Sequence, residues 1–73
     1  MEKEELEAIY DSFMKCVQKV EDAETDKTRA KWLKAAKEDY EDLHKHRNKY
    51  SKAQLRRVKR AMDFLEELEE VAE

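Results

Sequence analysis

The fold depends most on residues 43–62, which read LHKHRNKYSKAQLRRVKRAM. Ser51 is followed three positions later by Gln54, the spacing of a capping box, in which the two residues bond each other's backbone N–H groups at a helix start. Asn48, just before this box, is a residue type that can end a helix in the left-handed conformation. These features predict a break between two helices, the second beginning near residue 52.

Without that break, residues 28–72 would form one continuous helix, and the chain would become a long helical hairpin. The apolar seam of such a hairpin needs a second chain to cover it, which would give a dimeric four-helix bundle. The presence or absence of this break therefore decides between a monomeric bundle and a dimeric four-helix bundle. We favour the monomer and keep the homodimer as the alternative.

The apolar residues of the first segment recur at alternating intervals of three and four, which is the spacing of one buried helix face. This seam consists of Leu6, Ile9, Phe13, Cys16, Val20 and Ala23. It stops where residues 24–28 gather the residue types that cap helices. The third segment carries a similar stripe, made of Leu55, Val58, Ala61, Met62, Leu65, Leu68 and Ala72.

The second segment has a narrower stripe, with good seam positions only at Leu33, Ala36, Tyr40 and Leu43. Three such segments joined by short connections predict an all-α fold, a small up-down-up three-helix bundle. We expect one domain over residues 1–73, with helices at about 3–23, 28–47 and 52–71.

Composition narrows the class of protein further. Gly and Pro are both absent, and 48% of the 73 residues are charged. Turns that need positive φ, phosphate-cradling loops and nucleophile elbows therefore have no glycine to build them. The single cysteine cannot form an internal disulfide, which favours a reducing compartment. No apolar run approaches the ~18 residues of a membrane-spanning helix, so we expect a cytoplasmic protein with no membrane partner.

Charge is sorted along the chain. Residues 1–27 hold nine acids and four bases, residues 28–60 four acids and twelve bases, and residues 61–73 six acids and no base. In an up-down-up bundle, the acidic start of the first helix lies at the same end as the basic junction of the other two. The basic start of the second helix then meets the acidic end of the third. Each exposed pair contributes only ~0.2–1 kcal/mol, yet the pattern favours this topology.

The basic window between residues 44 and 60 is a candidate surface for an anionic partner, because clustered bases can neutralise phosphates. The candidate residues are Lys45, Arg47, Lys49, Lys52, Arg56, Lys59 and Arg60. Against nucleic acid stand the net charge of −3 and the lack of a set of stacking aromatics.

The sequence gives little support for a catalytic or a metal-binding site. His44 and His46 are two positions apart and point about 200° away from each other on a helix, so they cannot grip one metal ion. Cys16 lies in the seam, where a thiol packs as a small apolar group without an activating base. We therefore expect no catalytic residues, no metal and no cofactor, and no enzyme activity.

Four apolar residues are candidates for a protein interface, because aromatic anchors dominate binding energy at interfaces. They are Met14, Trp32, Phe64 and Val71. For Trp32, Phe64 and Val71 we favour the alternative interpretation, in which they close the side of the core. The sequence thus favours a small non-enzymatic helical module that binds a partner protein through exposed helix faces. The alternatives are a nucleic-acid-associated protein that uses the basic window, and a designed or structural helical scaffold without a natural partner.

Overall fold

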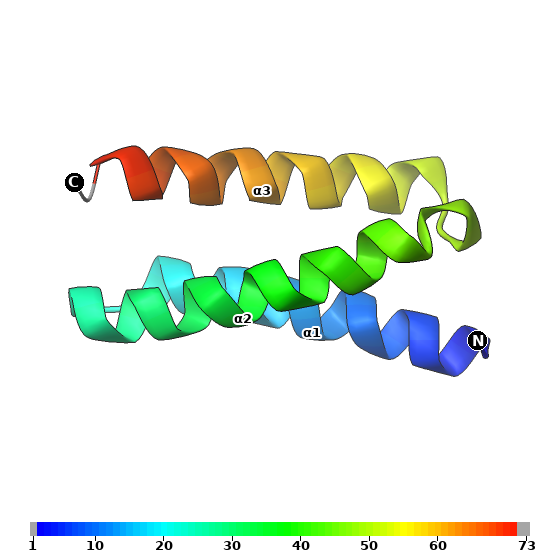
Figure 1. Cartoon of the computed structure of the whole chain (residues 1–73), viewed down its shortest axis with the longest axis horizontal. Coiled ribbons are helices and arrows are strands. Elements are labelled where there is room, and N and C mark those ends of the chain that lie inside the picture. Colours follow the sequence, from blue (N-terminus) through cyan, green and yellow to red (C-terminus); the bar gives the residue numbers. More distant parts are fainter. Residues whose placement is uncertain (1, 72–73) are drawn as a thin grey trace.

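The computed structural model describes the backbone of residues 2–71 and the side chains of residues 2–70. This part of the chain forms three α-helices and a short 3₁₀ turn: α1 (Lys3–Asp22), α2 (Asp26–Lys45), η1 (Arg47–Lys49) and α3 (Lys52–Val71). The helices run up, down and up, and the described residues include no strand (Figure 1). The predicted all-α three-helix bundle is confirmed.

The break between α2 and α3 is built by the capping box. The backbone N–H of Gln54 donates to Ser51 Oγ at 3.1 Å, and the backbone N–H of Ser51 donates to Gln54 Oε1 at 3.0 Å. These reciprocal bonds satisfy two donors that a helix start otherwise leaves open. Since α2 and α3 are separate helices, the continuous helix of the long hairpin does not form.

The end of α2 differs from the expectation for Asn48. No residue in the described range has a positive φ, and α2 instead ends at Lys45, with His46 as its C-cap at φ −110°. The backbone N–H of Lys49 donates to the His46 carbonyl at 2.9 Å, and that of Tyr50 to the Arg47 carbonyl at 3.3 Å. The left-handed helix end at Asn48 is therefore wrong, because a 3₁₀ turn satisfies these carbonyls with i→i+3 bonds.

The first connection is tighter than the sequence predicts. Thr25 is extended, and its Oγ1 accepts the backbone N–H of Thr28 at 3.2 Å. Because Thr25 is the residue that caps, α2 starts at Asp26 rather than at residue 28. Several neighbouring residues could have capped this helix, and only the path of the chain decides among them.

The core lies where the three seams meet. Its largest fully buried side chains are Phe13 and Val20 from α1, Leu43 from α2 and Leu65 from α3. Tyr50 joins them from the α2–α3 connection, and its hydroxyl donates to the Leu6 carbonyl at 2.8 Å. This buried bond ties the connection to the start of α1, 44 residues earlier.

Figure 1 places the N-terminal end of α1 at the same end of the bundle as the α2–α3 connection, and the end of α3 at the same end as the α1–α2 connection. Two ion pairs form among the described side chains, Arg29–Asp26 within α2 and Lys37–Glu69 between α2 and α3. The acidic start of α1 and the basic window thus share an end of the bundle without a direct pair in this part of the chain. Their attraction acts over a distance and is screened by salt.

Candidate functional site

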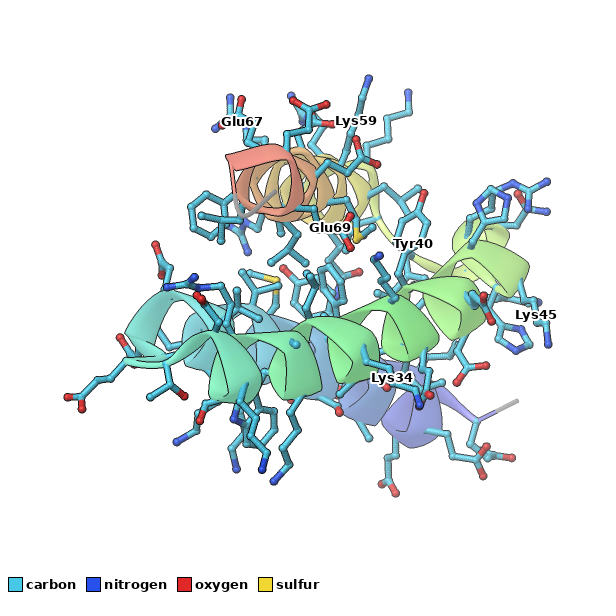
Figure 2. The ribbon with its side chains drawn as sticks, turned by 60° about the vertical axis from the view of Figure 1, so that its left-hand side comes forward. Lys34, Tyr40, Lys45, Lys59, Glu67 and Glu69 are labelled. Carbon is cyan, nitrogen blue, oxygen red and sulfur yellow. The ribbon has the colours of Figure 1, made fainter. Side chains whose placement is uncertain are left out.

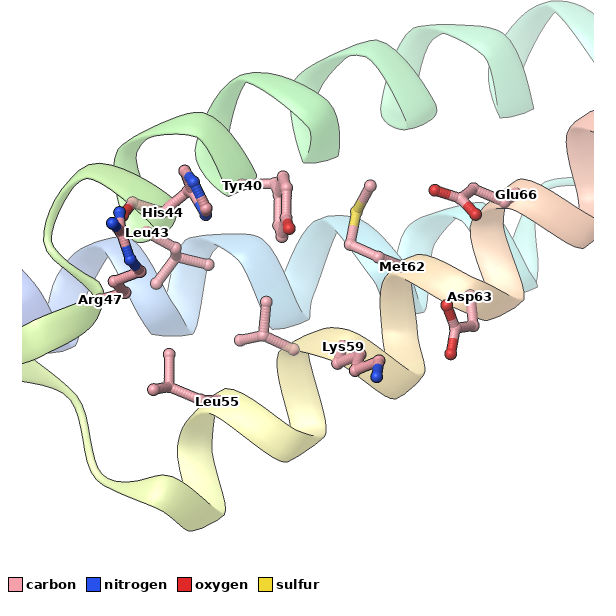
Figure 3. A pocket seen from close by; sticks show the side chains of 10 residues that line it. Tyr40, Leu43, His44, Arg47, Leu55, Lys59, Met62, Asp63 and Glu66 are labelled. Atoms are coloured by element: carbon pink, nitrogen blue, oxygen red, sulfur yellow. The ribbon is translucent and has the colours of Figure 1, made fainter.

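An open pocket of about 400 Å³ lies between α2 and α3 (Figure 3). We call it the α2/α3 groove. Its apolar lining consists of Tyr40, Leu43, Leu55, Val58 and Met62. Leu43 and Val58 are buried and form the floor, while the other three are half-buried and pack against the core from its edge. Ligand sites in proteins measure about 300–1,000 Å³, so the groove has the size of a small binding site.

The groove exists because α2 presents few large apolar side chains to α3. Leu55 and Met62 are seven residues apart, so they lie two turns apart on the same side of α3. The seam of α2 has only one residue, Tyr40, between the small Ala36 and Leu43. The stripe of α3 is therefore wider than the surface that α2 offers to it, and its outer edge stays partly exposed.

Tyr40 is held in place by two rings. Its centroid lies 6.4 Å from that of Phe13 in the core, at an interplanar angle of 44°, and 6.1 Å from that of His44 at the rim. Such offset and tilted aromatic pairs contribute ~0.5–1.5 kcal/mol beyond the area that they bury. Figure 2 shows Tyr40 and Glu69 in the space between α2 and α3. The wall of the groove is thus continuous with the core.

The rim of the groove carries charge of both signs. His44 and Arg47 lie at the end near the α2–α3 connection, and Asp63 and Glu66 lie toward the other end, with Lys59 between the two sets (Figure 3). All five side chains are exposed, and none forms an ion pair in the part of the chain that the structure describes. The rim therefore presents the unpaired charges of Arg47, Lys59, Asp63 and Glu66 to whatever occupies the groove.

A second hollow, of about 190 Å³, lies on the surface of α3 around Ala53. It is lined by Arg56, Arg57 and Arg60, which we call the arginine shelf. The three arginines are exposed and form like-charge i,i+3 and i,i+4 pairs, which destabilise a helix. Among residues 2–70 no carboxylate pairs with them.

The structure divides the predicted basic window between these surfaces. Arg47 and Lys59 stand on the rim of the groove, and Arg56 and Arg60 belong to the arginine shelf. The remaining candidates line neither surface and are exposed around the α2–α3 connection: Lys45, Lys49 and Lys52. Four of the seven candidates thus line a hollow, and the other three do not.

The predicted protein-interface residues lie elsewhere. Met14, Trp32 and Phe64 are half-buried and pack against the core, and none of them lines the groove. The Lys31 ammonium stands 5.4 Å from the centroid of the Trp32 ring, a cation–π distance. The side chain of Val71 falls outside the described residues. Sequence reasoning missed the groove because Tyr40, Leu55 and Met62 follow the core periodicity, and their only distinguishing signal is their place at the edges of the stripes.

The environment of Cys16 suppresses thiol reactivity. Its Sγ lies 3.7 Å from Asp39 Oδ2, and the same oxygen accepts the Ser12 hydroxyl at 2.8 Å. Burial first, and the nearby Asp39 carboxylate second, raise the pKa of the Cys16 thiol above its usual value. A nucleophilic cysteine needs a lowered pKa. The raised pKa of Cys16 therefore makes its thiol less reactive than an ordinary cysteine.

Within residues 2–71, no three side chains of metal-binding type gather closely enough to hold an ion, and none of the helices has the length and apolar character needed to cross a bilayer. No protein-family model matches the chain, and no curated protein or solved structure matches it either. Besides the α2/α3 groove and the arginine shelf, a third hollow of about 380 Å³ lies at the α1–α2 connection, with Trp32 in its lining.

Proposed function

We propose that this chain is a protein-interaction module that binds an amphipathic helix of another protein in the α2/α3 groove. The proposal rests on one observation. Tyr40, Leu55 and Met62 stay half-exposed around a shared pocket, while Val58, Ala61 and Leu65 of the same α3 stripe are buried. A helix with apolar side chains at positions i, i+4 and i+7 would cover them in the helix-in-groove mode of recognition.

The dimensions of the groove fit a short helix. On α3 its lining runs from Leu55 to Glu66, which corresponds to about 16 Å at 1.5 Å per residue. A partner helix of about three turns spans that length. An amphipathic helix also matches the lining chemically, since its apolar face meets the floor and its charged flanks meet the rim.

Exchange of Met62 for glutamine should weaken the binding of such a helix by about tenfold, because an amide placed against an apolar ligand loses water without gaining a partner. The probe is a synthetic helical peptide of about 12 residues, with three leucines at i, i+4 and i+7 and its acids and bases interspersed. Fluorescence anisotropy with a labelled peptide measures the affinity.

The matched control is Met14→Gln, which alters a half-buried methionine outside the groove. This variant should bind the peptide as the unaltered protein does. Equal affinities of the Met62→Gln and Met14→Gln variants would contradict the proposal, as would a protein that binds no such peptide. A mass near twice 8.8 kDa in light scattering, lost on addition of peptide, would instead identify a second copy as the occupant.

The arginine shelf favours a second candidate function, the binding of a nucleic acid through its phosphates. Three unpaired arginines around the small Ala53 leave room for an anion to approach closely.

If the arginine shelf binds nucleic acid, the protein binds duplex DNA at low salt, and the logarithm of the affinity falls linearly with the logarithm of the salt concentration. Arg56→Glu/Arg60→Glu should abolish this binding, and Lys31→Glu/Lys34→Glu, with the same change in net charge, should weaken it much less. Absence of DNA binding by the unaltered protein at low salt would exclude this candidate.

Cytoplasmic localisation belongs to the same proposal. The single cysteine is a buried free thiol, which suits a reducing compartment. A monomer leaves the groove open to a partner, whereas a dimer that covers the groove would compete with it.

A further inference from the structure

We infer that the α2/α3 groove has a direction: it selects a partner helix with segregated charges, whose acidic end lies over the α2–α3 connection and whose basic end lies toward the end of α3. This inference rests on the proposed function and names the chemistry of the partner. It follows from the order in which the rim charges occur along the groove.

The end of the groove near the connection is positive. The Arg47 guanidinium is positioned there because its Nη1 donates to the His44 carbonyl oxygen at 2.9 Å, and the side chain is otherwise exposed. Lys45, Lys49 and Lys52 are exposed around the same connection, and residues 43–62 contain no acid. An acidic side chain on a bound helix therefore meets Arg47 at this end of the groove, where the lining includes no acid.

The other end of the groove is negative. Asp63 and Glu66 stand on its rim, and no base follows them in the sequence. Glu69, one turn further along α3, is already paired with Lys37 of α2. That pair joins α2 and α3, so Lys37 already has an acidic partner. Asp63 and Glu66 are left for basic side chains of the occupant.

Selectivity arises because the charges act together. One exposed pair contributes little, but a helix bound in the wrong direction would turn every rim attraction into a repulsion. We expect a segregated helix to bind about tenfold more tightly than an interspersed one at low salt. The advantage should shrink as salt shortens the Debye length from ~10 Å at 0.1 M to ~3 Å at 1 M.

The test compares two peptides of identical composition, the interspersed probe described above and a version with its acids at one end and its bases at the other. A nitroxide on the acidic end of the segregated peptide reports direction, because it broadens the NMR signals of nearby amides. We expect tighter binding of the segregated peptide, with broadening of residues 44–55 and not of residues 63–70.

The exchange Lys59→Glu/Asp63→Lys disrupts the order of the rim charges while keeping the net charge. It places the acid before the base at i,i+4, an orientation that stabilises a helix, so a loss of selectivity would not come from unfolding. This variant should bind both peptides equally. The control is Lys34→Glu/Glu38→Lys, an equivalent exchange of exposed residues on α2, where Lys34 points away from α3 (Figure 2). This variant should keep the preference for the segregated peptide.

The outcomes separate this inference from the proposed function. If the unaltered protein binds both peptides equally, or if the nitroxide broadens residues 63–70, the direction is wrong while the groove remains a helix-binding site. If neither peptide binds, both proposals are wrong. Retention of the preference in the Lys59→Glu/Asp63→Lys variant would also overturn the inference.

Discussion

Replacement of Phe13 by alanine is expected to lower the free energy of unfolding by about 3–5 kcal/mol. The Phe13 side chain is 0% exposed and lies at the centre of the core, so its removal leaves a cavity that α1 and α2 cannot fill without moving. A domain of this size has a stability near the low end of ~5–15 kcal/mol. We therefore expect a large unfolded fraction at room temperature.

Urea unfolding followed by circular dichroism measures this loss. The control is Met14→Ala, next to Phe13 but half-buried, which should cost less than about 2 kcal/mol. Similar losses in the two variants would contradict the assigned core. The Phe13 variant should also weaken peptide binding, because Phe13 supports the Tyr40 ring that walls the groove.

Replacement of Tyr50 by alanine is expected to cost about 3 kcal/mol, the second largest effect. The Tyr50 side chain is 9% exposed, packs with its ring centroid 6.5 Å from that of Tyr10, and donates to the Leu6 carbonyl. Tyr50→Phe removes only the hydrogen bond and should cost about 1 kcal/mol. Urea unfolding of the two variants separates packing from hydrogen bonding, and equal stability of Tyr50→Phe and the unaltered protein at pH 8 would contradict the buried bond.

The pH dependence of stability provides an independent check on Tyr50. Burial first, and Asp42 second, raise the pKa of the Tyr50 hydroxyl above its ordinary value of 10.0. The folded state thus holds this proton more tightly than the unfolded state does. Its contribution to stability is complete below pH 10 and is lost as the pH rises from there through the pKa of the folded state. The Tyr50→Phe variant should lose less stability than the unaltered protein over that range.

The helices are the part of this fold that local sequence predicts well. Phe13, Val20, Leu43 and Leu65 fall on the expected seams and are fully buried. The capping box at Ser51 forms as expected, because its partners are three residues apart and need no other part of the chain. The left-handed end at Asn48 failed for the opposite reason. Whether a helix ends in that way or in a 3₁₀ turn depends on where the following segment must go.

The candidate site is less visible in the sequence. Leu55 and Met62 follow the same helical spacing as the buried core residues. Nothing in the sequence indicates that they line a groove. Tyr50 lies in a connection where no periodicity exists, and its burial depends on Leu6 at the far end of the chain. The charge blocks indicate which ends of the helices share a pole, but not which charges stand on the rim of a pocket.

By itself, the sequence determined three helices, their buried faces and the absence of glycine-dependent loops, since each of these follows from interactions within a few residues. Only the tertiary structure decided that Tyr50 closes the core, that Cys16 meets Asp39, and that α2 leaves the edge of α3 uncovered. The physical reason is that the separation of two packed helices depends on the volumes of side chains from all three. The α2/α3 groove is set by that separation, so no single stretch of the chain encodes it.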